Sequence, residues 1–179
     1  ALDLLEFVRV RKLGKASVRA FNPSRDEHGY ESAHTVLQIL TEDSPFLVDS
    51  VGMAIHAAEQ AVHAVIHPLY KIERDAGGHV LSVVADTEEG KGKHESLMHF
   101  EISRISDAAE LTKLHDAVAS ALDDVRNAVA DWKPMREKML VVAENMGKSK
   151  LPIDAASIAE AQEFLRFVAD DHFTFLGYR

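Results

Sequence analysis

HTVLQILTEDSPFLVDSVGMAIHAAEQAVHAVIHPLYKIERD, residues 34–75, predicts a strand, a tight turn, a helix and a second strand. Residues 34–41 place apolar and β-branched side chains on both alternating faces, which is typical of a strand buried on both sides. Ser44 and Pro45 then fit the N-cap and the first position of a helix. Apolar residues at helical spacing extend this helix over residues 45–60, with one stripe that packs on a sheet.

The second strand is predicted over residues 62–72, where the period changes to two and one face is more polar than the other. Pro68 has no N–H to donate to a strand ladder, so we expect a bulge or an edge position there. A helix that joins two strands of one sheet makes a right-handed βαβ crossover. Residues 76–78, Ala-Gly-Gly, are typical of a hairpin turn, so a third strand over residues 79–85 should pair antiparallel with the second.

The clearest alternation lies in residues 96–104, where Met98, Phe100 and Ile102 face inward and the side chains between them face outward. This pattern predicts a strand in the middle of the core. The loop before it, residues 86–95, is rich in charges and glycine and contains nothing that we expect to be buried. It should be exposed and mobile.

A long amphipathic helix is predicted over residues 107–132, because Asp107 stands three residues before Glu110, as in a capping box, and apolar residues follow at helical spacing. Pro134 should stop or kink this helix. We therefore expect one domain over residues 1–133. The remainder, residues 134–179, is interpreted as a helical connector and the truncated start of a next domain.

The two ends of the chain are less regular. Residues 4–10 fit a helix end or a strand equally well, whereas residues 16–21 predict a short strand that joins the edge of the sheet. Near the other end, Asp154 is placed to cap a last helix. Residues 173–179 resemble the beginning of a strand with no evident partner, which favours a piece of a longer polypeptide.

Composition excludes several classes of function. The formal net charge of −9 argues against nonspecific binding to nucleic acid or to an anionic membrane. The absence of cysteine excludes disulfides, thiolate nucleophiles and cysteine-ligated metals. With no apolar run long enough to span a membrane and no signal-peptide pattern, a cytoplasmic location is expected. Residues 9–25 are basic, and we interpret them as a solvated or internally paired face rather than a binding patch.

Residues that could carry catalysis lack supporting partners in the sequence. His63, His67 and His99 fall on strand faces and could in principle meet as metal ligands, but no metal-binding spacing accompanies them, so no metal site is predicted. Residues 170–172, Asp-Asp-His, fit an ordinary helix terminus better than acid–base machinery. No nucleophile, dinucleotide or paired-carboxylate motif occurs, and the GKGK of residues 90–93 is followed by a strand where a phosphate loop requires a helix. No catalytic residue is therefore predicted.

The remaining candidate site is the turn that joins the first buried strand to its helix, because free backbone amides at a helix N-terminus attract anions such as a carboxylate. Its residues are Asp43, Ser44, Pro45, Phe46 and Leu47. Simple helix capping is the competing interpretation of the same residues.

Five motifs occur in order and at natural spacing: HTVLQILTEDSPFLVDSV, HAVIHPLYKIERD, ESLMHFEISRI, LDDVRNAVADW and DHFTFLGYR. Together they resemble the N-terminal region of the large bacterial NAD-specific glutamate dehydrogenases, over about residues 19–179. The predicted arrangement of elements is also similar to the ACT domain, a small regulatory module. The fold implied is α+β, an ACT-like (ferredoxin-like) antiparallel-rich sheet with helices on one face, followed by a helical tail.

The resemblance implies a homo-oligomeric, cytoplasmic parent enzyme that oxidises L-glutamate to 2-oxoglutarate with NAD, with its catalytic and NAD-binding residues beyond residue 179. For this fragment it implies no cofactor, and its partners are other copies of itself and the rest of the parent chain. Many ACT domains bind amino acids, so an amino-acid effector is the alternative role, but they usually have glycine where this sequence has Pro45-Phe46. We therefore expect an assembly role rather than amino-acid sensing. The strand over residues 16–21 is expected to take the place that the final ACT strand normally fills.

Overall fold

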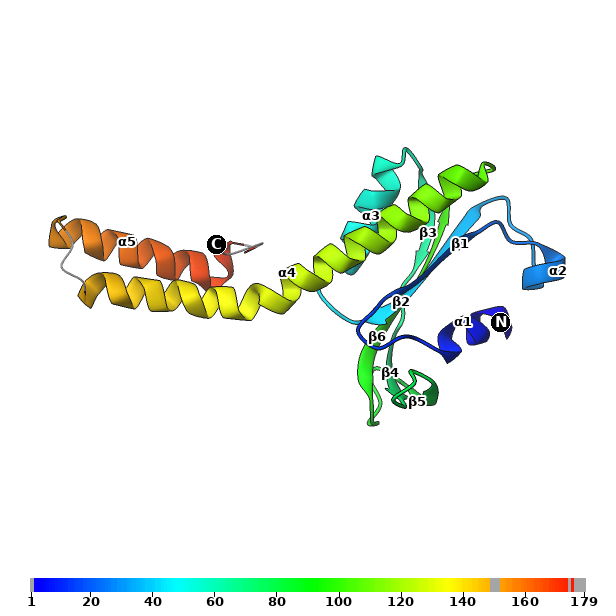
Figure 1. Ribbon diagram of the computed structural model, residues 1–179, viewed down its shortest axis with the longest axis horizontal. Helices are drawn as coiled ribbons and strands as arrows, with labels where there is room; N and C mark the ends of the chain where they lie inside the picture. The colour runs from blue at the N-terminus through cyan, green and yellow to red at the C-terminus, as the bar shows by residue number, and fades with distance from the viewer. Residues whose placement is uncertain (1, 149–151, 174, 176–179) are drawn as a thin grey trace. The chain divides into compact units, whose positions relative to one another are not determined.

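The computed structural model describes residues 2–148, 152–173 and 175. Its elements follow one another as α1 (Leu2–Arg9), β1 (Ser17–Phe21), α2 (Arg25–His28), β2 (Thr35–Glu42), α3 (Leu47–Ala57), β3 (Val62–Ile66), β4 (Leu69–Arg74), β5 (Val80–Ala85), β6 (Lys93–Ile102), α4 (Ala108–Lys148), α5 (Ala155–Phe167) and the π-helical turn η1 (Val168–His172) (Figure 1). The chain divides into two compact units, Ala1–Val125 and Arg126–Arg179. The first contains the sheet.

The two central strands are those with the strongest sequence patterns. Every side chain of β2 from Thr35 to Leu40 is buried, which confirms a strand enclosed on both faces. It pairs antiparallel with β6, where Met98, Phe100 and Ile102 are almost fully buried as predicted. β2 pairs with β1 and β6, and β6 pairs with β2 on one side and with β3 and β4 on the other, so both strands lie in the middle of the sheet.

The strand order within the described residues is β1-β2-β6-β4-β5, with β3 also paired to β6. Since β2 and β3 are each antiparallel to β6, they run parallel to one another with β6 between them, joined by α3. β1 occupies the edge beside β2, which is the place predicted for it. The α+β, ACT-like architecture is thereby confirmed.

The predicted second strand is divided in two. β3 ends at Ile66 and β4 begins at Leu69, because Pro68 lies between them and cannot donate to the ladder of β6. β5 then pairs with the outer edge of β4, as the hairpin turn predicted. Of the two strands that pair with this side of β6, β3 keeps a free edge and β4 does not, among the residues that the structure describes.

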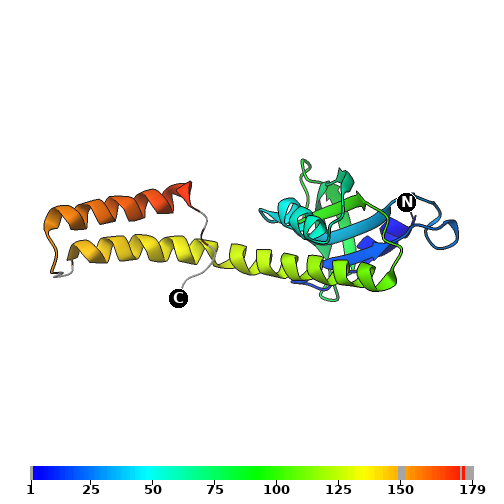
Figure 2. The same ribbon diagram turned by 90° about the horizontal axis from the view of Figure 1, so that it is seen from above.

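α3 and the first part of α4 cover one face of the sheet (Figures 1 and 2). Leu47, Val51 and Ile55 of α3 are buried against the sheet. The buried residues of α4 in this unit share one helical stripe: Leu114, Val118, Leu122 and Val125. This arrangement confirms the prediction that helices cover one face of the sheet.

Residues 4–10, for which helix and strand fit equally well, belong mainly to α1. Two further segments differ from the sequence prediction. β6 begins at Lys93, inside the segment predicted as an exposed loop. α4 runs through Pro134 without ending there; the missing N–H costs one helical hydrogen bond, and neighbouring side chains such as Met135 and Ala143 are buried in the second unit.

The second unit is a helical hairpin made from the later part of α4 and from α5. Asp154 caps α5 as predicted, with its side chain accepting a hydrogen bond from the Ser157 amide at 2.9 Å. Gln162 of α5 donates to the Ala143 carbonyl oxygen of α4 at 2.7 Å. The strand predicted over residues 173–179 falls largely outside the described residues. No helix in the described parts of the chain has the length and apolar character needed to cross a membrane.

Candidate functional site

The turn between β2 and α3 has an unusual backbone. Ser44 is not the helix cap; Phe46 occupies that position, with φ 71° and ψ 4° and no side-chain capping bond. The predicted cap and proline positions are therefore wrong by two residues. A bulky side chain in the left-handed region costs about 1–2 kcal/mol, which is offset here because the turn delivers Leu47 into the core at 4% exposure.

The predicted site residues line this turn, but their charges do not favour an anion. Asp43 donates its backbone N–H to the His94 carbonyl oxygen at 2.9 Å, so that amide is already used. Asp49 lies in the first turn of α3, and Glu42 ends β2. The Glu42 carboxylate forms an ion pair with the nearby Lys93 at 3.1 Å. Phe46 projects its ring outward at 54% exposure, where glycine would leave room for a ligand. The charged side chains described at this turn are therefore mainly carboxylates, and Phe46 adds an exposed apolar ring.

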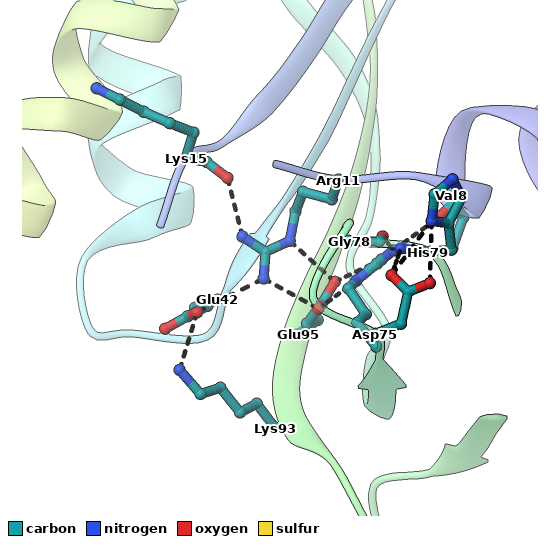
Figure 3. Close-up of polar contacts among 10 residues, drawn as sticks. Val8, Arg11, Lys15, Glu42, Asp75, Gly78, His79, Lys93 and Glu95 are labelled. Atoms are coloured by element: carbon teal, nitrogen blue, oxygen red, sulfur yellow. Dashed lines mark hydrogen bonds and ion pairs between the residues drawn. The ribbon is translucent and has the colours of Figure 1, made fainter. Parts of the chain in front are cut away.

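A buried ion cluster holds the segment after α1 against the sheet, and the sequence did not predict it (Figure 3). Glu95 is 1% exposed and accepts hydrogen bonds from two guanidinium groups. Arg11 donates to its two oxygens at 3.2 and 3.0 Å, and Arg74 donates at 2.7 and 2.9 Å. Arg74 also donates to the carbonyl oxygens of Val8 and Gly78, at 3.1 and 2.8 Å.

Glu95 stays ionised despite its burial. Burial alone would raise the pKa of its carboxyl group, but the hydrogen bonds and charges of Arg74 and Arg11 outweigh that effect and hold the pKa below its ordinary value. The expectation that residues 86–95 contain nothing buried is wrong at this residue. The missed signal was the alternation itself, which continues from Leu97 back to Glu95.

Several cations of the basic segment after α1 are paired within the chain, in agreement with the favoured interpretation. Besides Arg11, Lys15 contacts Asp123 of α4 at 3.3 Å. Arg19 pairs with Asp3 at 2.6 Å and stacks over the Phe7 ring at 4.6 Å. An anionic partner would need free cations, and these basic residues are already paired within the chain.

The three histidines considered as metal ligands each contact a different partner. His63 stacks on His34, with ring centroids 4.4 Å apart, while His67 contacts the Ser96 hydroxyl and His99 contacts the Gln38 amide. Within residues 2–148, 152–173 and 175, no three side chains of the ligand-forming types converge on a point that could hold a metal ion. At the other end of the chain, His172 belongs to η1 and stacks on Phe167 at 3.9 Å, as expected of a helix terminus.

Comparison with known proteins gives consistent matches. Residues 1–118 match the family model described as glutamate dehydrogenase, ACT1 domain. The chain is 38% identical over 162 residues to the NAD-specific glutamate dehydrogenase of Pseudomonas aeruginosa, covering 90% of this chain and 10% of that protein. It is 39% identical over 180 residues to that of Halomonas elongata, covering 99% and 11%, and 26% identical over 174 residues to that of Mycobacterium tuberculosis, covering 96% and 10%. The chain spans about a tenth of the length of these curated relatives.

Proposed function

The chain belongs to the family of glutamate dehydrogenase ACT1 domains, and from this premise we propose that it acts as an assembly module of a large NAD-dependent glutamate dehydrogenase. ACT domains are regulatory, and the fragment itself is expected to carry no catalysis. In the parent, L-glutamate and NAD would yield 2-oxoglutarate, ammonium and NADH in the cytoplasm, through residues that lie outside this chain. The similarity to NAD-specific glutamate dehydrogenases supports NAD as the cofactor of the parent.

The observation that carries the assembly role is the free edge of β3. Its backbone groups on that side have no neighbouring strand among the described residues, and Val62, Val65 and Ile66 are 42%, 44% and 61% exposed. An exposed apolar edge strand is a template for pairing with another chain. β5 covers the corresponding edge of β4, so the surface proposed for assembly is the edge of β3 alone.

Sedimentation of the chain tests this proposal. The wild type should give a mass above that of the 19.8 kDa monomer, and Val65→Lys should shift it to the monomer by placing a charge on the paired edge. Val83→Lys is the matched control, because Val83 is 48% exposed and lies on β5, another edge strand. A purely monomeric wild type, or an equal effect of both substitutions, would contradict assembly through β3.

Absence of catalysis is tested separately. The isolated chain mixed with L-glutamate and NAD should form no NADH above a protein-free blank. Turnover that disappears on His63→Ala or His99→Ala would instead assign a self-contained enzyme to the histidine-bearing face.

Amino-acid sensing is the second candidate, and the left-handed backbone at Phe46 is the observation that favours it. Residues held in strained backbone conformations gather at ligand sites. Calorimetric titration with a panel of amino acids distinguishes the two roles. Saturable millimolar binding that strengthens in Phe46→Gly, where the ring no longer blocks backbone approach, would favour sensing at residues 43–47. Its absence in both proteins would leave assembly as the role of the module.

A further inference from the structure

A cavity of about 380 Å³ lies on the sheet face opposite α3 and α4, beside α1. Leu4 of α1, Leu97 of β6 and Ile66 of β3 form its apolar walls, and Ile66 is 61% exposed at its rim. Its volume falls within the usual range for small-molecule pockets, about 300–1,000 Å³. The cavity lies wholly in the first unit and is separate from the turn at residues 43–47.

The polar wall of this cavity is a continuous hydrogen-bonded chain. Arg19 donates to both carboxylate oxygens of Asp3, at 3.0 and 2.6 Å, and its Nε donates to Gln38 Oε1 at 2.8 Å. The Gln38 side chain is 3% exposed, and its Nε2 lies 3.1 Å from His99 Nδ1. Because Gln38 Oε1 faces the guanidinium, Nε2 must donate to His99. His99 Nδ1 is then the acceptor, and the neutral ring carries its proton on Nε2.

The surroundings of the cavity penalise charge. Burial is the main cause that lowers the pKa of His99; Arg19 lowers it further, while Glu101 opposes the shift. Burial is also the main cause that raises the pKa of Tyr30, with Asp3 adding to it. Both groups are neutral near pH 7, and the same loss of hydration would disfavour a charged ligand. Arg19, which holds the lining residues Asp3 and Gln38 from behind, already directs its donors at them, so a carboxylate in the cavity would find no free guanidinium group.

Hydrogen-bonding capacity nevertheless remains in the cavity. Among the residues that the structure describes, the hydroxyls of Tyr30 and Tyr70, which both line the cavity, have no hydrogen-bond partner. The Nε2–H of His99 lies 4.0 Å from Glu101, beyond hydrogen-bond range. A ligand with an apolar body and one or two polar groups would satisfy these groups while its body covers the apolar walls.

We propose that this cavity binds an uncharged small molecule with an apolar body and one or two hydrogen-bonding groups. Such a ligand is distinct from an amino acid, from NAD and from glutamate, all of which are charged. The cavity shares Ile66 with the edge of β3 proposed for assembly, and it shares no lining residue with the turn at residues 43–47.

Three probes that share one ring system test the proposal: neutral indole, anionic indole-3-acetate and cationic tryptamine. Each is titrated at pH 7 into the whole 179-residue chain, with the ring signals of His99, Tyr30 and Tyr70 followed by NMR. Indole should shift these signals saturably at millimolar concentration, and the two charged probes should bind at least tenfold more weakly. No saturable shift with indole, or a charged probe that equals it, would overturn the proposal.

A matched pair of variants locates the binding. Leu4→Trp fills the cavity from α1 and should weaken indole binding at least tenfold, while Leu5→Trp adds the same ring to the neighbouring residue, which is 66% exposed and does not line the cavity. The second variant should bind like the wild type. Equal binding by the two variants would assign indole to another surface and overturn the proposal. The comparison of indole, indole-3-acetate and tryptamine uses the wild-type chain and does not depend on the folding of either variant.

Discussion

At the scale of single residues, Glu95 is the carboxylate whose removal should be felt most. Glu95→Gln leaves the buried guanidinium group of Arg74 without its carboxylate partner and leaves Arg11 only the half-exposed Glu42 at 3.6 Å, so we expect the free energy of unfolding to fall by about 3–5 kcal/mol in urea denaturation. Glu42→Gln is the control, since Glu42 is 40% exposed and its ion pairs should contribute at most about 1 kcal/mol. An equal loss of unfolding free energy from both substitutions would contradict the claim that burial makes the Glu95 ion pairs stronger than those of Glu42.

The same residue predicts a pH dependence. Its folded-state pKa lies below the ordinary value of 4.5, so its stabilisation is fully present above about pH 4.5 and is lost as the pH falls through the lower folded pKa. The difference in unfolding free energy between the wild type and Glu95→Gln should therefore shrink below pH 4.5. A constant difference from pH 7 to pH 3 would show that ionisation of Glu95 is not the source of the stability.

Phe46 gives the opposite expectation, a substitution that stabilises. Phe46→Gly relieves a left-handed backbone that costs a bulky residue about 1–2 kcal/mol, while glycine adds about 0.5–1 kcal/mol of unfolded-state freedom. The net gain should be up to about 1 kcal/mol by thermal or urea unfolding. Met53→Gly, at a 66% exposed position in the middle of α3, should instead lose about 0.5–1 kcal/mol. A loss from Phe46→Gly as large as that from Met53→Gly would mean that the Phe46 ring stabilises the turn.

At the scale of elements, the buried central strands should resist exchange most strongly. Amides of β2 from Val36 to Leu40 and of β6 from Met98 to Ile102 are expected to show the slowest hydrogen exchange, because both strands have neighbours on each side. The edge strands β1, β3 and β5 should exchange faster. Rapid exchange in β2 and β6 would contradict the strand order.

Pro134 makes a second prediction at this scale. It lies inside α4, where proline typically costs about 3 kcal/mol relative to alanine. Pro134→Ala should therefore raise the melting temperature followed by circular dichroism, whereas Pro152→Ala, outside the helices, should not. If Pro134→Ala lowers the melting temperature, the helix depends on the local geometry that proline imposes.

Sequence patterns predicted the elements well where the information is local. Alternation located β2 and β6, and turn residues located the β4–β5 hairpin. They failed where a distant partner decides the outcome. Glu95 can be buried because Arg11 and Arg74, which lie 84 and 21 positions away in the sequence, pair with it; alternation places Glu95 on the face of Leu97 but does not identify these partners. The cap at Phe46 was missed for a similar reason, since burial of Leu47 overrides the preference of Ser44 and Pro45 for a helix start.

At the scale of the molecule, the core of the first unit extends beyond the family match. That match ends at residue 118, but Leu122 and Val125 of α4 are 3% and 8% exposed and belong to the first unit. A chain that stops at residue 118 should lose about 1.5–3 kcal/mol for each of these side chains. A chain that stops at residue 133, the predicted domain boundary, should keep both. Urea unfolding of the two truncated chains measures the difference, and equal stability would exclude Leu122 and Val125 from the core.

The position of β6 has a consequence for synthesis on the ribosome. This strand is the last of the sheet to be translated, yet β2, β3 and β4 all pair with it. Until Ile102 has left the exit tunnel, the strands made earlier have only the β1–β2 and β4–β5 pairings available. Translation proceeds at about 5–20 residues per second, so the apolar strand β2 waits for seconds with one edge open. During that interval the nascent chain presents a surface suited to a ribosome-associated chaperone, and the order of translation, rather than the final stability, sets its exposure to aggregation.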